Sequence, residues 1–249
     1  MALLLPALVL LAVPFATLLG ITPWTHFTLA YGDVPAVIVS LGYGVVALVI
    51  IVLIGLPVAW WLATSARQGL LRKSVELLVL LPLMTPPLAM GILLISAFGP
   101  YSFLGEGLSA LGVSVVNNPV AFVLAQLYGG LPYFIVTARS AFSAIPRGIL
   151  EAGQTLGARP WQRFRLLALP LAASGLASAV ALAWVRAIGE FGIVMIFAYF
   201  PQGMPVRLYT NLQNDGVDAV YTLVWVLLLV TLPIPLFCFM HSAKREKLR

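Results

Sequence analysis

Six runs of apolar residues follow one another along the chain, separated by shorter polar segments. The runs cover about 2–21, 37–64, 75–98, 119–138, 170–197 and 218–241. About 20 consecutive apolar residues cross the hydrocarbon core of a bilayer as a helix. The first run lacks the basic residues that precede the apolar core of a secretory signal. The pattern therefore predicts an all-α, polytopic membrane fold with six transmembrane helices, in a single domain over residues 1–249.

The composition points to the same class of protein. The chain is 61% hydrophobic and 9% charged, whereas soluble domains average about 25% charged residues. The net charge of +6 is not arranged as a basic stripe with interleaved aromatic residues, so we expect no nucleic-acid partner. The single cysteine, Cys238, rules out a disulfide within the chain.

The positive charges are distributed unevenly between the two sets of loops. If the N-terminus is cytoplasmic, Arg207 is the only Lys or Arg in the outer loops, and Arg186 lies within an apolar run. Cytoplasmic segments then hold the other twelve: Arg67, Arg72, Lys73, Arg139, Arg147, Arg159, Arg163, Arg165, Lys244, Arg245, Lys247 and Arg249. Lys and Arg accumulate on the cytoplasmic side of membrane proteins. We therefore expect a multi-pass protein of the cell membrane with both termini in the cytoplasm.

Prolines interrupt two of the runs. The third contains Pro82, Pro86 and Pro87, and the last contains Pro233 and Pro235. A proline in a helix frees a backbone carbonyl, which in a membrane must be satisfied by protein or by water in a cavity. The prolines are open to two interpretations, an ordinary kink or a helix beside a translocation path. Pro86 and Pro87 are accordingly candidate path residues.

The sequence contains none of the common signatures of enzymes. GxxxxGK[ST], HExxH and GxSxG are missing, and the nearest match to a phosphate loop, GLLRKS at 69–74, lacks the second glycine. Two histidines and one cysteine are too few for a zinc site. We expect neither catalytic residues nor a bound metal or cofactor in this chain.

One polar segment, EAGQTLGARPWQRFRLLALP at 151–170, stands between two apolar runs. A helix beginning after Pro146 places four residues on one face, and Gly157 is suited to end it in a left-handed conformation. Pro160 then begins a second helix that reaches the membrane at Pro170. The shared face consists of Ile149, Ala152, Gly153 and Leu156. Such a face suits a groove on a partner protein and a lipid surface equally well.

The spacing within this segment resembles the cytoplasmic EAA loop of ABC importer permeases. That loop has EAA, three residues, Gly, nine residues, and Ile-x-Leu-Pro; here Gly153 replaces the third Ala and Leu167 replaces Ile. The resemblance implies that residues 140–169 form a coupling loop that docks on a separate ATPase subunit. It assigns the docking role to Arg147, Glu151, Ala152, Gly153, Leu156 and Gly157.

The resemblance extends over about residues 37–240. LLPLMTPPLAMG, LPYFIVTARSAF and RAIGEFGIVMIFAYFPQGMPVRLY are similar to the permeases for sulfate, molybdate and tungstate, and the last segment is most similar to the molybdate/tungstate branch. The fold implied is that of type I ABC importer permeases. The substrate implied is an oxyanion, either molybdate/tungstate or, as the alternative, sulfate/thiosulfate.

Arg186 and Glu190 are the two charged residues inside the fifth run. Four residues apart, they can touch on one helix face. Charges in a membrane usually face the bundle interior or water. The sequence leaves three interpretations open, a cationic lining of the path, a structural ion pair, or residues at the membrane interface.

The resemblance also implies the partners. These are a second copy of the chain, two ATPase subunits that hold ATP and Mg²⁺ on the cytoplasmic side, and an oxyanion-binding protein outside. Two other classes stay open: a channel or scaffold that works without ATP, and an intramembrane enzyme whose catalytic groups the sequence does not reveal.

Overall fold

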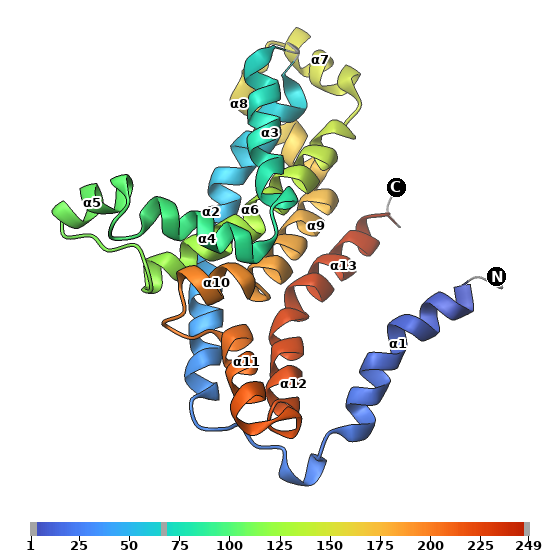
Figure 1. The fold of residues 1–249 in the computed structure, drawn as a ribbon. Coiled ribbons are helices and arrows are strands. Elements are labelled where there is room, and N and C mark those ends of the chain that lie inside the picture. Colours follow the sequence, from blue (N-terminus) through green and yellow to red (C-terminus); the bar gives the residue numbers. More distant parts are fainter. Residues whose placement is uncertain (1–3, 66–68, 247–249) are drawn as a thin grey trace.

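The computed structural model describes residues 4–65 and 69–246, and every regular element in these two ranges is helical (Figure 1). The prediction of an all-α fold is therefore confirmed. Three long helices form the centre: α2 (Asp33–Thr64), α6 (Pro119–Ser143) and α9 (Leu169–Ile188). They pack closely because small residues such as Ala59, Ala138 and Ala183 are fully buried between them. Small residues at helix interfaces are typical of membrane bundles.

Four helical segments are long and apolar enough to cross a membrane. They are Asp33–Thr64, Pro119–Ser143, Pro160–Phe197 and Val217–Cys238. A bent pair, α3 (Leu70–Met84) and α4 (Pro87–Phe98), adds a fifth if it is one span. The apolar part of α1 (Leu4–Ile21) is shorter, at Leu5–Ile21. The predicted count of six crossings therefore stays a prediction.

Three of the predicted runs are broken. Prolines predicted an interruption of the third and the last run, whereas the break in the fifth run was not expected. The run at 75–98 bends by 116° between α3 and α4, at Thr85 and Pro86. The run at 170–197 stops at Ile188 and resumes as α10 (Gly192–Phe197). The last run divides at Leu232 into α12 (Tyr221–Thr231) and α13 (Pro233–Glu246). Prolines explain the first and third breaks, because a proline lacks the N–H of the helical ladder.

Two helices lie in loops for which the sequence predicted no regular structure. α5 (Phe103–Ala110) begins at Ser102, whose hydroxyl accepts a hydrogen bond from the Gly105 N–H. α11 (Met204–Asp215) lies beside the first turns of α2 (Figure 1). Short 3₁₀ turns occur at Trp24–His26 and Val217–Ala219. α11 lies at the end of the bundle opposite the predicted coupling loop, whereas α5 projects to one side of the bundle, next to α4 (Figure 1).

Arg207, the only arginine of the predicted outer loops, is neutralised inside the protein. Its Nε donates to Asp33 Oδ1 at 3.1 Å, and Asn211 Nδ2 donates to the same oxygen at 2.9 Å. Asp33 is 1% exposed. The pair joins α11 to the start of α2, so Arg207 has a structural role and leaves little free positive charge at this end.

α1 stands apart from the other helices in Figure 1. Its apolar side chains are mostly exposed, among them Leu10, Leu11 and Phe15. The polypeptide after α1 is held by Trp225, which donates from Nε1 to Thr22 Oγ1 at 2.9 Å and packs on Trp24. A free apolar helix of this kind has a large surface available for lipid or protein.

Candidate functional sites: a coupling loop and a pocket at a broken helix

The predicted coupling loop forms a helix, a turn and a second helix. α7 (Arg147–Thr155) lies at one extremity of the molecule (Figure 1). Gly157 follows it with a φ of 80°, a left-handed conformation that favours glycine. α8 (Pro160–Gln162) then begins at Pro160, as predicted. The local structure expected for 146–160 is therefore confirmed.

The second helix differs from the expected one in its internal hydrogen bonding. Residues Arg163–Ala168 form a π-helical segment, η2, that leads directly into α9. Pro170 is the second residue of α9, and the Leu169 N–H just before it bonds to the Phe164 carbonyl five residues back, in the π-helical pattern. The backbone is helical at both junctions, so α8, η2 and α9 follow one another without a break from the loop into the membrane span.

The predicted shared face of α7 is only partly available to a partner. Gly153 is buried, and a Cβ placed on it would lie 2.7 Å from Leu167 Cδ1. Gly153 therefore allows α7 to approach η2 of its own chain, which corrects the expectation that this glycine admits another surface. Ala152 is exposed, and Leu156 is 87% exposed. These two residues remain open for docking.

Glu151 and Arg147 lie on another side of α7. Both are exposed, and both line a hollow of about 820 Å³ between α7 and the ends of α2 and α6. Arg163 crosses from η2 to α7, where its Nη1 donates to Gln154 Oε1 at 3.1 Å. The predicted docking residues therefore lie in three different places. Gly153 is buried against η2, Ala152 and Leu156 are exposed, and Arg147 and Glu151 line the polar hollow.

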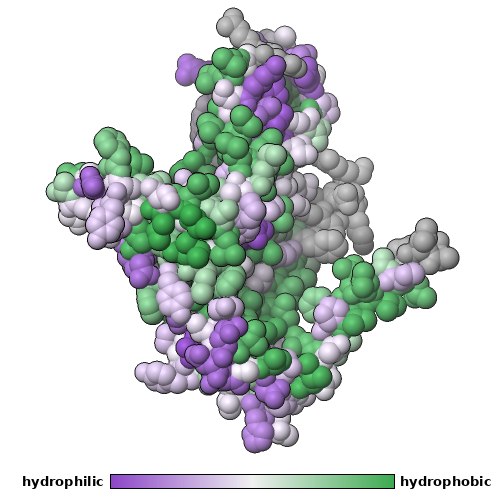
Figure 2. All heavy atoms as spheres, in the orientation of Figure 1, coloured by the Kyte–Doolittle hydropathy of each residue, from purple (hydrophilic) through white to green (hydrophobic). Residues whose placement is uncertain are grey.

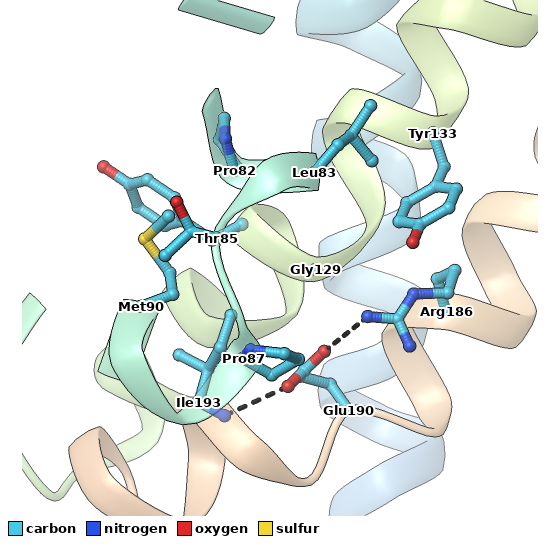
Figure 3. A pocket seen from close by; sticks show the side chains of 11 residues that line it. Pro82, Leu83, Thr85, Pro87, Met90, Gly129, Tyr133, Arg186, Glu190 and Ile193 are labelled. Atoms are coloured by element: carbon cyan, nitrogen blue, oxygen red, sulfur yellow. Dashed lines mark hydrogen bonds and ion pairs between the residues drawn. The ribbon is translucent and has the colours of Figure 1, made fainter. Parts of the chain in front are cut away.

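A second, smaller pocket of about 60 Å³ lies where α3 breaks from α4 (Figure 3). Pro82, Leu83, Thr85, Pro87, Met90, Tyr128, Gly129, Tyr133, Arg186, Glu190 and Ile193 line it. Both prolines are exposed at the bend, and of the two only Pro87 is among the residues that line the pocket. Neither proline has an N–H to donate to the carbonyls of Pro82 and Leu83, which explains why the helix breaks here.

Arg186 and Glu190 meet in this pocket, with Arg186 Nη2 donating to Glu190 Oε2 at 3.0 Å (Figure 3). Glu190 lies beyond the end of α9, contrary to the prediction that both residues belong to one helix. Its other oxygen accepts from the Ile193 N–H at 3.0 Å, at the start of α10. The ion pair therefore stabilises the break between α9 and α10.

The guanidinium of Arg186 stays partly accessible although Arg186 is paired with Glu190. The Arg186 side chain is 31% exposed, against 1% for Glu190, and it lies over the Tyr133 ring at 5.1 Å from the centroid. Gly129 admits the carboxylate, since a Cβ there would lie 2.9 Å from Glu190 Oε2. The sequence did not single out Gly129 and Tyr133. The two residues are four apart on α6, and this spacing places them on the same helix face. It was the one feature of the sequence that could have predicted that they line a common site.

A helical bundle with several spans, a broken span at a polar pocket and a helical loop projecting from one end defines a multi-pass membrane protein of the transport class. Residues 55–242 match the family described as the inner membrane component of binding-protein-dependent transport systems. The chain belongs to this family of ABC transporter permeases.

Several relatives are about one third identical to this chain over the aligned regions. A probable molybdenum ABC transporter permease of Haloferax volcanii is 36% identical over 70% of this chain and 62% of its own. The molybdenum transport system permease ModB of Mycobacterium bovis is 36% identical over 78% and 74%. The molybdate/tungstate permease WtpB of Thermococcus kodakarensis is 30% identical over 68% and 63%. The chain spans less than two thirds of the first and third of these relatives.

Solved structures share the fold. A chain of the bacterial alginate ABC transporter, crystallised with a periplasmic protein bound to alginate pentasaccharide, matches with a TM-score of 0.79 at 18% identity, covering 99% of this chain and 94% of that one. A chain of the inward-facing methionine transporter MetNI matches with a TM-score of 0.69 at 20% identity, covering 85% and 94%. The predicted fold of a type I ABC importer permease is thereby confirmed.

Proposed function

We propose that this chain is the membrane subunit of an ATP-driven importer and forms the translocation path for an oxyanion of the molybdate/tungstate type. The observation that carries the proposal is the continuity of the loop with the path. The same uninterrupted helix begins beside α7, at Gly153, and carries Arg186 to the pocket at its other end. A continuous helix between a cytoplasmic loop and the pocket is what a transporter driven by a separate ATPase subunit requires, and a channel does not require it.

The substrate class rests on two lines of support. The relatives described above carry molybdenum, molybdate or tungstate in their names. The pocket at the helix break presents a partly exposed guanidinium, and an arginine binds oxyanions well because its N–H groups form a planar fork. Sulfate and thiosulfate have similar shape and charge and are the alternative substrates.

The partners follow from the same proposal. Two ATPase subunits, holding ATP and Mg²⁺, bind at the α7 end, where Leu156 and Ala152 are exposed. A soluble oxyanion-binding protein delivers substrate at the opposite end, near α11 (Figure 1). A second copy of this chain completes the path, and the exposed apolar surface of α1 gives that copy, together with lipid, an area to cover.

The proposed mechanism is a two-state movement driven from the cytoplasm. ATP binding draws the two ATPases together, and each α7 follows the subunit to which it is docked. Because α7 packs on η2 through Gly153 and Leu167, the movement reaches α9 and changes the pocket at its far end. ATP thus favours one of two arrangements of the path, in the manner of other switching proteins.

A channel or scaffold is the competing class. It requires no motor, so solute flux through it would be the same with and without ATP. An intramembrane enzyme is the third class, and it requires a nucleophile paired with a base. The dependence of oxyanion flux on ATP separates the importer from the channel.

The sidedness of the proposal is testable by labelling. Gly107 in α5 and Gly148 in α7 are exposed helical glycines, and a Cβ on either has no heavy atom within 4 Å. Gly107→Cys and Gly148→Cys, each in a Cys238→Ala background, therefore form a matched pair, and we expect neither substitution to disturb the fold. We expect a membrane-impermeant maleimide to label only Gly107→Cys in intact cells and both after lysis. Labelling of Gly148→Cys in intact cells would reverse the topology.

A further inference from the structure

The hollow beneath α7 combines positive charge with an apolar wall. Arg72, Arg147 and Arg163 line it together with a single acid, Glu151. Arg72 is already paired with Glu76 at 3.1 Å, but Glu76 also faces Arg139 at 2.9 Å, so one carboxylate serves two guanidiniums. The surroundings therefore keep an excess of positive charge. Trp60, Phe142, Ile145 and Leu150 provide the apolar part of the wall.

The hollow lies at the level where two membrane spans end. The spans Asp33–Thr64 and Pro119–Ser143 terminate at its rim, and Thr64 and Ser143 line it. Trp60, one turn before the end of α2, packs against Phe142 at 5.1 Å between ring centroids. Tryptophan near the end of a span is typical of the headgroup region. The charged part of the hollow is therefore placed beside lipid headgroups.

The arginines have hydrogen-bonding capacity left for a ligand. Arg147 is exposed and can turn its guanidinium toward the hollow, whereas Arg163 donates from Nη1 to Gln154 and its Nε is buried. The hydroxyl of Ser143 and the exposed side chain of Arg147 lie around the same space, whereas the Thr64 hydroxyl already donates to the Trp60 carbonyl at 2.8 Å. Guanidinium groups and hydroxyls together match the acceptor oxygens of a phosphate group.

We propose that this hollow binds the phosphate headgroup of an anionic membrane phospholipid, with its acyl chains along the apolar wall and the adjoining span. Basic pockets between membrane helices are known to recognise such headgroups. The volume of about 820 Å³ is large for a free phosphate and adequate for a glycerophosphate headgroup. Bound lipid fills the space between α7 and the ends of α2 and α6, so the lipid composition of the membrane sets how firmly the coupling helix is supported.

Two matched pairs of substitutions test this site. Arg147→Gln/Arg163→Gln removes two charges from the hollow, and Arg159→Gln/Arg165→Gln removes two from exposed positions of the same loop that are not among the lining residues. The full-length chain in neutral detergent is titrated with phosphatidylglycerol, and bound lipid is counted by native mass spectrometry. Phosphatidylcholine, which has no net charge, and inorganic phosphate are the comparison ligands.

We expect phosphatidylglycerol to bind more tightly than phosphatidylcholine. The lining pair should lose about tenfold or more in affinity for phosphatidylglycerol, since each charge near an anionic lipid accounts for roughly fivefold, while the control pair stays close to wild type. Should the lining pair fail to fold, Arg147→Glu alone, at an exposed residue, should also weaken binding. Millimolar inorganic phosphate should not displace the lipid.

Three results would overturn the proposal. Equal losses in the two pairs would indicate diffuse attraction between a basic loop and lipid. Binding of inorganic phosphate in place of lipid would make the hollow a site for a free anion. Unchanged lipid binding in the lining pair, together with lost ATPase association, would assign the arginines to the protein partner.

Discussion

Arg186→Gln should assemble poorly, because it leaves the carboxylate of Glu190 buried without its cation. Glu190 is 1% exposed and lies inside a membrane-spanning segment. Removing one member of a buried ion pair costs about 3–5 kcal/mol in proteins. We expect the yield of folded Arg186→Gln in the membrane, measured by fluorescence-detected size-exclusion chromatography, to fall severalfold. Arg159→Gln, at an exposed position outside the membrane, is the control and should keep its yield.

The double variant Arg186→Gln/Glu190→Gln separates a structural role from a role in the path. It removes both charges and allows the side chain at 190 to keep accepting from the Ile193 N–H, so we expect assembly to recover. Oxyanion uptake should nevertheless stay at least about tenfold below wild type, because an arginine–oxyanion contact contributes about 1.5–3 kcal/mol. Recovered assembly with full uptake would leave the pair a purely structural role. A well-assembled single variant with normal uptake would contradict both roles.

Gly157→Val and Glu151→Lys should separate ATP hydrolysis from transport while the membrane part stays folded. Gly157 has a φ of 80°, which a β-branched residue disfavours strongly, so the turn after α7 should be re-formed at a different angle. Glu151→Lys reverses the only acidic charge of the loop at an exposed position. Exposed substitutions usually change stability by under about 0.5 kcal/mol. We therefore expect normal insertion of Glu151→Lys but weakened ATPase association or loss of substrate-stimulated hydrolysis.

Two control variants match these changes. Gly148→Val places the same side chain at an exposed glycine of α7 with ordinary helical conformation and open space around it. Glu106→Lys makes the same charge reversal at an exposed residue of α5, which projects from the side of the bundle away from α7 (Figure 1). In both control variants, we expect the amount of oxyanion imported per ATP hydrolysed to stay at the wild-type value. Pull-down of the ATPase and the ratio of oxyanion imported to ATP hydrolysed are the measurements. Normal ratios in Gly157→Val and Glu151→Lys would mean that α7 is not the docking element.

The membrane class and the local structure of the loop were predictable because each depends on short-range signals. Apolar runs determine where a helix can cross lipid, and the positions of Pro146, Gly157 and Pro160 determine where helices begin and end. Figure 2 shows the consequence, with hydrophilic residues gathered at the α7 end and around α11, and hydrophobic residues between. The family resemblance depended on the spacing of the same loop residues.

Prolines predicted that the third and last runs are interrupted. The size of the bend in the third run, the break after α9 and the burial of Gly153 were not predictable in the same way. The sharp bend at Thr85 and Pro86 is possible because α10 packs against α4, and that contact joins residues far apart in the sequence. Glu190 leaves α9 yet still reaches Arg186, because the Ile193 N–H and the gap at Gly129 hold its carboxylate in place. Gly153 is buried by Leu167, a residue of the following helix. In each case a tertiary contact, absent from any local pattern, decides the outcome.

ATP-dependent uptake is the measurement that tests the importer assignment most directly. The chain is reconstituted into liposomes with the proposed ATPase subunit and oxyanion-binding protein, and uptake of radiolabelled molybdate is followed with ATP and Mg²⁺ or with ADP. We predict uptake against a gradient with ATP, none with ADP, and none when the binding protein is left out. Equal molybdate flux with ATP and ADP, or flux through the chain alone, would contradict the assignment and favour a channel.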